Sequence, residues 1–374
     1  MKMAAIGWFL GRAGGSTVST ELVVREALKA IAAPPSPQSF YDDQFEDIDD
    51  EHFPKWMFQD SCFLLAFMMA MGGDGDGGDA TLQGLSTVIF QPCIDSIMRN
   101  VMLLENQIPW RVLEVLMRFL PEPVPVDRFL SLMEAKFNVR TTSGGHGHHD
   151  KRAAAGPNIA DNGGERGGGR QRPMHLLALF RDHQVIGLQT LHPAEDNRRR
   201  LISTTSSANF STAMELAEMG MRFNLAASRI GRFGDMAVVQ RGRLLFRKLF
   251  LAPVFLNDLT ACWLVNMAAY EASASRSADD YAISSYLYLV ALLMNREDDV
   301  QQLRARCIVH STFSNTQTLD FFKGLAPHLH FGRQLIASCR TSWTTGAIGR
   351  SSLPFTSFST TTSRPSSLSC PSSA

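Results

Sequence analysis

Three polar residues of this 374-residue chain, Glu105, Asn106 and Gln107 in the stretch "ENQIPW", interrupt an apolar run and raise the question of whether they do chemistry. A carboxylate such as that of Glu105 can act as a general acid or base. The three side chains can instead satisfy backbone groups where one helix ends and the next begins. Pro109 favours this second interpretation, because proline costs about 3 kcal/mol inside a helix but is tolerated at its first position. We therefore predict two helices that meet at residues 106–108.

Two further groups carry side chains typical of metal sites. "HGHHD" places His146, His148 and His149 close together, but its glycine-rich surroundings lack the second layer of hydrogen bonds that orients metal ligands. "GGDGDGGD", residues 72–79, lacks the spaced ligands and the terminal Glu of a calcium loop. We interpret both as surface loops, and we predict no metal ion and no cofactor.

Motifs that identify common enzyme classes are missing from the sequence, which has no GxSxG, HExxH or P-loop pattern. The 36 basic and 36 acidic residues cancel, which argues against a dedicated nucleic-acid-binding protein. We interpret the short basic runs at Arg198–Arg200 and Arg241–Lys248 as solvated loop and strand charges. A non-catalytic protein is expected. The alternative, a hydrolase-type enzyme with an unrecognised site, would be favoured by a deep pocket lined by His175, His183 or Glu271.

The elements that position these residues are predicted to be mainly helices, because apolar residues recur at helical spacing. Alternating residues around 221–252 predict a small β-hairpin or three-strand element. The fold class is therefore mainly α, with a single helical domain. The predicted helices are Phe53–Met71, two between residues 85 and 120, 173–183, one that begins at a Thr212 capping box and ends at Gly220, Asp258–Ala272, Tyr281–Met294, and one capped by Asp298 or Asp299.

Composition divides the chain into three parts. Residues 1–40 are poorly patterned and are predicted to be poorly ordered. Residues 41–330 form the helical domain, whose glycine-rich insert at 141–172 is predicted to be disordered. Residues 331–374 form a Ser/Thr-rich tail with the same expectation. No stretch reaches the roughly 20 apolar residues that span a bilayer, and six cysteines without CxxC spacing predict reduced thiols.

Several stretches, in order along residues 40–326, resemble the plant-specific domain of unknown function 247 family. They include "DSCFLLAFM", in which Ser61 and Ala66 replace the family's usual Gly and Glu, "MLLENQIPW", "STAMELAEMGMRF" and "NMAAYE". We interpret the matching residues as architectural, in helix caps, helix junctions and buried hydrogen bonds. These signature residues are Asp60, Cys62, Phe63, Glu105, Asn106, Gln107, Pro109, Glu215, Asn266 and Glu271.

The resemblance implies an uncharacterised plant protein with no catalytic residues to carry over, since no enzymatic activity is established for the family. Some grass members act in pollen–stigma self-incompatibility, which implies a protein-interaction or recognition module with unknown protein partners and no nucleic acid. Family members are usually membrane-associated, but here the tail at 331–374 stands in place of the family's transmembrane segment. Residues 1–40 also lack the usual N-terminal motif. The chain is therefore expected to be soluble or peripheral, and the tail to derive from a shifted reading frame or an alternative exon.

Overall fold

The structure is a computed structural model. It describes residues 1–14, 19–34, 41, 52–73, 79–137, 172–185, 212–225, 233, 237–240, 247–274 and 281–330. The tail at 331–374, and the insert at 141–172 apart from Arg172, lie outside these residues, so their predicted disorder stays a prediction.

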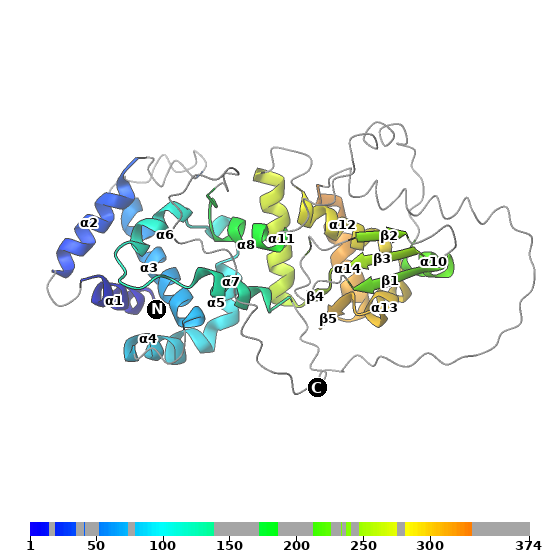
Figure 1. Ribbon diagram of the computed structural model, residues 1–374, viewed down its shortest axis with the longest axis horizontal. Coiled ribbons are helices and arrows are strands. Elements are labelled where there is room, and N and C mark those ends of the chain that lie inside the picture. The colour runs from blue at the N-terminus through cyan, green and yellow to red at the C-terminus, as the bar shows by residue number, and fades with distance from the viewer. Residues whose placement is uncertain are drawn as a thin grey trace, which may run out of the picture. The chain divides into compact units, whose positions relative to one another are not determined.

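The chain divides into two compact units, where the sequence had indicated one helical domain. The first comprises Met1–Glu134 with His146–Phe180, and the second Ala135–Gly145 with Arg181–Ala374. The boundary falls inside one helix, α8 (Leu176–Val185). The mainly helical class is confirmed in both units (Figure 1).

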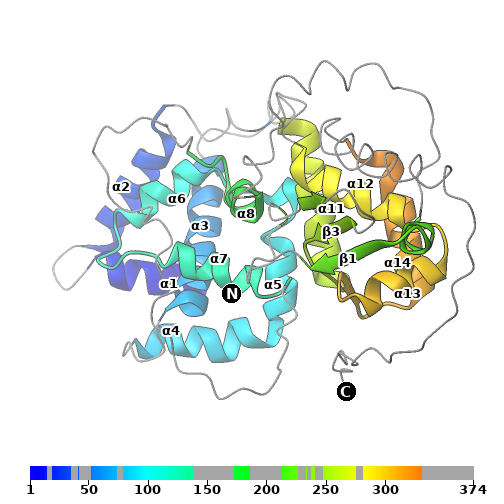
Figure 2. The same ribbon diagram turned by 45° about the vertical axis from the view of Figure 1, so that its right-hand side comes forward.

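The first unit is built from helices around α3, which packs against α1, α2, α6 and α7 (Figure 2). In chain order its elements are α1 (Lys2–Ala13), α2 (Thr20–Ala32), α3 (His52–Gly72), α4 (Ala80–Gly84), the π-helix η3 (Leu85–Phe90), the 3-10 turn η4 (Gln91–Cys93), α5 (Ile94–Asn100), the 3-10 turn η5 (Leu104–Asn106), α6 (Trp110–Met117), α7 (Val126–Glu134) and the first half of α8.

Helix α3 supplies the core of this unit, and it matches the predicted helix Phe53–Met71. Its Phe67 ring meets those of Phe90 and Phe129 edge-on, with ring centroids 5.4 and 5.7 Å apart. The helix ends at Gly72, where an added Cβ would lie 2.9 Å from a side-chain carbon of Pro125. A larger residue there would push α3 away from the segment that leads into α7.

The N-terminal segment, predicted to be poorly ordered, instead forms α1 and α2. Helix α1 buries Trp8 and Phe9, and α2 buries an apolar stripe with four-residue spacing, Val23, Ala27 and Ile31. This spacing is one face of a helix. Short apolar stripes between small and charged residues gave too weak a pattern, and α3 provides the surface that stabilises them.

The second unit combines helices with two small sheets. Its elements are the second half of α8, α10 (Ala213–Glu218), β1 (Met221–Leu225), β2 (Ala237–Gln240), β3 (Arg247–Leu251), β4 (Val254–Leu256), α11 (Asp258–Ala274), α12 (Ala282–Leu293), α13 (Glu297–Ala305), β5 (Val309–Ser311), α14 (Asn315–Leu325) and the 3-10 turn η8 (Ala326–His328).

The three-strand element predicted at 221–252 is confirmed, with strand order β1-β3-β2. Strand β3 pairs in parallel with β1, where Phe223 lies opposite Leu249, and antiparallel with β2. Residues 241–246, which connect β2 to β3, lie outside the described residues. A second sheet, in which β4 and β5 pair in parallel, was not predicted, because strands of three residues leave almost no alternating pattern.

The core of the second unit contains paired aromatic rings. The ring of Tyr286 lies 4.9 Å from that of Phe233, and Trp263 lies 5.6 Å from Phe137, measured between ring centroids. The Tyr286 hydroxyl is fully buried and donates to the backbone oxygen of Ala252, so α12 is joined to the end of β3. Burial raises the pKa of this phenol above its ordinary value.

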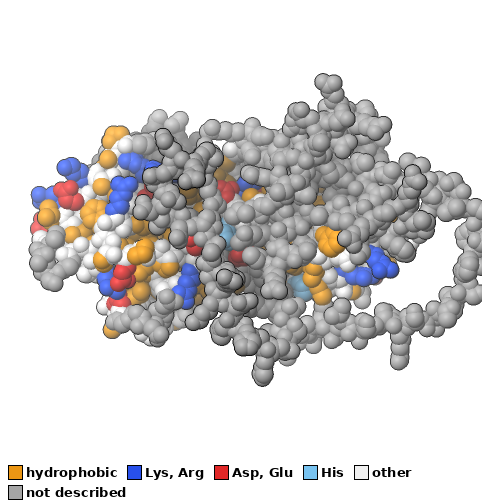
Figure 3. Space-filling model, in the orientation of Figure 1, with side chains coloured by type: hydrophobic (Ala, Val, Ile, Leu, Met, Phe, Trp, Pro, Cys, Tyr) orange, Lys and Arg blue, Asp and Glu red, His pale blue; other side chains and the backbone are white. Residues whose placement is uncertain are grey.

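The surface of the described residues carries mixed charge. On the face drawn in Figure 3, basic and acidic side chains of the first unit are interspersed with apolar ones. Across the ranges that the structure describes, no helix is both long enough and apolar enough to traverse a lipid bilayer.

Candidate functional site

The "ENQIPW" stretch is the predicted junction between two helices. Helix α5 ends at Asn100, earlier than the predicted meeting point at residues 106–108, and η5 follows. Helix α6 then begins at Trp110, with Pro109 as its N-cap. The prediction placed Pro109 at the first helical position, whereas it is the residue just before it. At both positions the backbone N–H has no partner within the helix, so proline loses nothing by lacking one.

Gln107 is the central residue of the corner that the α5–α6 junction forms, and it is 8% exposed. Its Nε2 donates to the backbone oxygens of Val101 (3.0 Å) and Leu103 (2.6 Å), which the end of α5 leaves without helical partners. Its Oε1 accepts from the N–H of Leu177 (2.9 Å) in the first turn of α8. The backbone oxygen of Gln107 in turn accepts from the Tyr41 hydroxyl (2.7 Å). The prediction that this residue satisfies freed backbone groups is correct.

Asn106 and Glu105, the other two polar residues of this stretch, make fewer hydrogen bonds than Gln107. The Asn106 side chain donates to the backbone oxygen of Asn100 (3.0 Å) and so closes the end of α5. Glu105 is exposed, and the described residues offer it no hydrogen bond, so the predicted role in the junction is not seen for this carboxylate. The corner therefore depends on the two amides.

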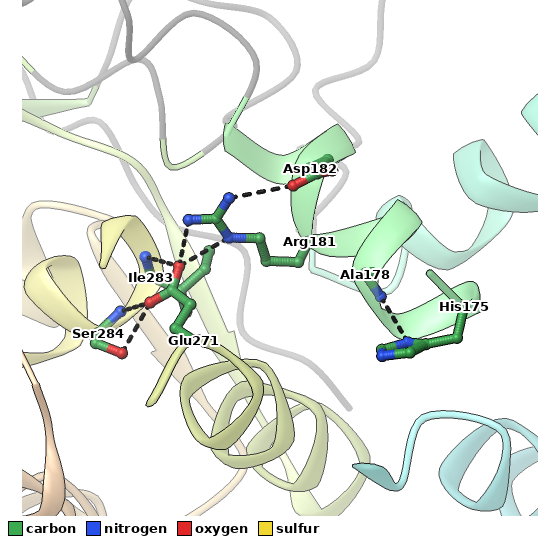
Figure 4. Close-up of polar contacts among 7 residues, drawn as sticks. All are labelled: His175, Ala178, Arg181, Asp182, Glu271, Ile283 and Ser284. Carbon is green, nitrogen blue, oxygen red and sulfur yellow. Dashed lines mark hydrogen bonds and ion pairs between the residues drawn. The ribbon is translucent and has the colours of Figure 1, made fainter. Parts of the chain in front are cut away.

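The start of α8 is held by further hydrogen bonds beside the one to Gln107. The N–H of Ala178 donates to Nδ1 of His175 (3.1 Å; Figure 4). The N–H of Trp110 donates to the backbone oxygen of Met174 (2.7 Å), so α6 and α8 start side by side. Burial lowers the pKa of His175 from 6.5 to about 4. The imidazole is therefore neutral near pH 7 and free to accept this bond.

Glu271, near the end of α11, accepts several hydrogen bonds and is 1% exposed. Its Oε1 accepts from the N–H of Ile283 (3.0 Å), and its Oε2 accepts from the N–H and the hydroxyl of Ser284 (both 2.8 Å; Figure 4). These are the second and third residues of α12, whose own N-cap residue, Tyr281, makes no side-chain capping bond. Glu271 therefore caps α12 from another helix.

Arg181, in the second half of α8, balances the charge of Glu271. Its Nε and Nη2 both lie 2.8 Å from Oε1 of Glu271, and its Nη1 lies 3.1 Å from Asp182 (Figure 4). The Arg181 side chain is 14% exposed. Burial alone would lower its pKa, but the Glu271 carboxylate outweighs this and raises the pKa. The largely buried ion pair is thus supported by further hydrogen bonds to both partners.

Asp299 joins two helix starts in the same way. Its Oδ2 accepts from the N–H groups of Asn295 (2.9 Å) and Arg296 (3.0 Å), and its Oδ1 accepts from Met214 (3.0 Å) at the start of α10. Burial raises its pKa, but these hydrogen bonds outweigh burial and hold it below its ordinary value. The prediction that Asp298 or Asp299 is the N-cap is wrong in detail, because Arg296 is the N-cap and Asp299 reaches back from the third helical position.

Asp79, the last residue of the Gly/Asp stretch, is the N-cap of α4. Its Oδ1 accepts from the N–H groups of Thr81 (3.0 Å) and Leu82 (3.2 Å). Its Oδ2 accepts from Trp8 (3.0 Å) and Arg12 (3.1 Å) of α1. Within the described part of the chain, no three His, Cys, Asp or Glu side chains are grouped so that they could hold a metal ion. The three histidines at 146–149 lie outside it.

The signature residues of α3 lie along that helix. Asp60 forms an ion pair with Lys2 of α1. It also adds to the effect of burial, which raises the pKa of Tyr41 to about 12. Cys62 is buried, which raises the pKa of its thiol, and the Phe63 ring meets that of Phe90 edge-on at 5.7 Å.

Two signature residues of the second unit have local structural roles. Glu215 completes the predicted capping box, in which the N–H of Thr212 donates to its carboxylate (3.1 Å) and its own N–H donates to the Thr212 hydroxyl (3.4 Å). Gly220 then follows with φ 87°, the predicted left-handed end. Asn266 donates to the backbone oxygen of Cys262 (2.9 Å) within α11.

The signature residues are therefore divided between the two units. Asp60, Cys62, Phe63, Glu105, Asn106, Gln107 and Pro109 belong to the first unit, and Glu215, Asn266 and Glu271 to the second. His175 also lies in the first unit, and His183 in the second. We did not anticipate Arg181, although a cation beside an apolar helix face was the available signal.

Fold and site together define a mainly helical protein in which polar residues, often distant in sequence, hold the starts of helices. The chain belongs to the family DUF247, described as a plant protein of unknown function, whose sequence profile matches residues 1–342. The match thus includes α1 and α2, which precede the stretches that carried the resemblance.

Sequence comparison also finds a relative in Arabidopsis thaliana, the UPF0481 protein At3g47200. It is 21% identical over 289 residues, which are 74% of this chain and 54% of the relative. The chain thus spans about half the length of that protein. No solved structure matches the present chain.

Proposed function

We propose that this chain is a non-catalytic protein-interaction or recognition module. The observation that supports this most directly is the use of Glu271, whose two oxygens accept from α12 and from Arg181. A carboxylate held this way has no lone pair directed at a substrate, and a general acid or base needs one. Asp299 and Gln107 are occupied in the same manner. Recognition is also what the family resemblance implies, since some grass members act in self-incompatibility.

The test is capture of partners from plant tissue with the full chain as bait, followed by reciprocal capture and a stoichiometry measured by analytical ultracentrifugation. Two exposed apolar side chains serve as matched surface probes: Trp56 of the first unit, 47% exposed, and Val265 of the second, 39% exposed. We expect Trp56→Gln or Val265→Gln to weaken one defined complex while thermal unfolding stays unchanged.

The proposal fails if no defined complex forms. It fails equally if the purified chain turns over members of an ester, glycoside and phosphate substrate panel. Such an activity must copurify with the protein and saturate with substrate. That outcome would favour the hydrolase-type enzyme.

A further inference from the structure

Helix α8 is anchored in both compact units, because their boundary falls between Phe180 and Arg181. In the first unit, Gln107 Oε1 accepts from the N–H of Leu177 (2.9 Å). In the second, Arg181 bonds to Glu271 (2.8 Å). Residues 177 and 181 are four apart, so in a regular helix the N–H of Arg181 donates to the backbone oxygen of Leu177.

The length of α8 makes these anchors depend on each other. It has 10 residues, and helices shorter than about 12–15 residues are marginal in water without tertiary contacts. Losing the Gln107 anchor frees the first turn, and the freed turn no longer fixes the backbone from which the Arg181 side chain extends. Glu271 then loses its cation, and α12 loses a properly placed cap.

We propose that α8 is a conformational coupling element: opening of its Gln107 end loosens the Arg181–Glu271 anchor and the start of α12, and the reverse also holds. This inference does not rest on the proposed function. A coupling of this kind is reciprocal, because the free energy that links two equilibria is the same in both directions. A partner that bound either unit would thereby alter the local stability of the other.

Hydrogen exchange of single amides in the full chain tests the coupling. Gln107→Met removes the anchor at nearly constant volume, and the amides of Ile283 and Ser284 report on the start of α12. We expect their exchange to accelerate roughly fivefold or more, as the loss of one buried hydrogen bond predicts. The matched control is Asn106→Ala, which removes a bond from the same corner without touching α8 and is expected to leave both amides unchanged. Amides of α14 serve as the reference for global unfolding.

The reverse experiment uses Arg181→Met, with Asp182→Asn as its control, and follows the amides of Leu177 and Ala178. We expect acceleration by a similar factor. Two results overturn the proposal: effects confined to the unit that carries the substitution, and reporter amides that accelerate no more than reference amides elsewhere in their own unit, α14 for Ile283 and Ser284 and α2 for Leu177 and Ala178. Should Gln107→Met fail to fold, Gln107→Asn shortens the anchor by one carbon and is judged by the same readouts.

Discussion

The corner at Gln107 and the cluster at Glu271 perform the same task with different chemistry. Each holds the start of a helix from outside that helix: Gln107 caps α8 from 70 residues away, and Glu271 caps α12 from the preceding helix. Gln107 is a neutral amide that both donates and accepts. Glu271 only accepts, and it carries a charge that Arg181 balances.

The difference shows what each solution requires. An amide placed between carbonyl oxygens and an N–H group satisfies all three without burying a charge. A buried carboxylate binds N–H groups more strongly, but it needs a cation, because an unpaired buried charge is far more costly than an unpaired dipole. The second unit should therefore be more sensitive than the first to losing its central polar residue.

The largest expected effect is that of Glu271→Gln, which keeps the shape of the side chain and removes its charge. Arg181, only 14% exposed, is left without its buried counter-ion. We expect a loss of about 3–5 kcal/mol in the free energy of unfolding, measured by urea titration. The control Asp182→Asn removes the partner of Arg181 that is 58% exposed and should cost below about 1 kcal/mol. Equal losses for the two variants would contradict the comparison.

Gln107→Met should cost less, about 2–3 kcal/mol, because it strands dipoles and not a charge. The backbone oxygens of Val101 and Leu103 and the N–H of Leu177 lose their partner together. Urea titration beside Asn106→Ala, where a single exposed bond is lost, separates the buried anchor from the exposed one. A loss for Gln107→Met larger than that for Glu271→Gln would reverse the ranking of the two sites.

The sequence predicted the corner well because its cause is local. Pro109 and the freed groups after α5 both follow from residues within one short stretch. What it did not predict are the distant partners: the sequence shows that Gln107 can accept a bond, but not that Leu177 supplies it. The same holds for Glu271, which was expected to be architectural without a known partner. Pairings across 70 or 90 residues depend on how helices pack, which local patterns do not encode.

The errors have similar physical origins. Residues 1–40 were expected to be poorly ordered, yet α1 and α2 form because α3 offers an apolar surface to stripes too short to stabilise helices alone. The division into two units was not anticipated either. Its boundary lies within a regular helix, where composition gives no linker-like signal.

The next effect, a loss of about 2 kcal/mol in the free energy of unfolding, arises from protonation of His175 at low pH. The pKa of His175 is lowered from 6.5 to about 4 by burial. Its contribution to stability is therefore complete above pH 6.5 and is lost as the pH falls toward 4, at up to roughly 1.4 kcal/mol per pKa unit before partial exposure is discounted.

His175→Asn keeps a side chain that can cap Ala178 and removes the titration. Denaturant titrations of both proteins between pH 7 and pH 4 should therefore show the protein with His175 losing stability relative to the variant as the pH falls. His310, whose pKa burial also lowers, titrates in both proteins and cancels in the difference. Parallel curves would show that His175 does not bear on the stability of this corner.

The smallest effect concerns a helix end and not a start. Helix α13 ends with the N–H of Cys307 bonded to Arg304 (2.8 Å) and that of Ile308 bonded to Leu303 (3.0 Å), the pattern in which the residue after the cap is left-handed. Cys307 occupies that place with φ 57°, where a Cβ costs about 1 kcal/mol relative to glycine. Cys307→Gly should therefore raise the free energy of unfolding by up to about 1 kcal/mol, as measured by thermal unfolding.

The control Cys307→Ala removes the thiol but keeps the Cβ. An equal gain for this variant would assign the effect to the sulfur and not to backbone strain. The gain is local, unlike the losses at Glu271 and Gln107, because this end is closed by its own backbone and not by a distant side chain.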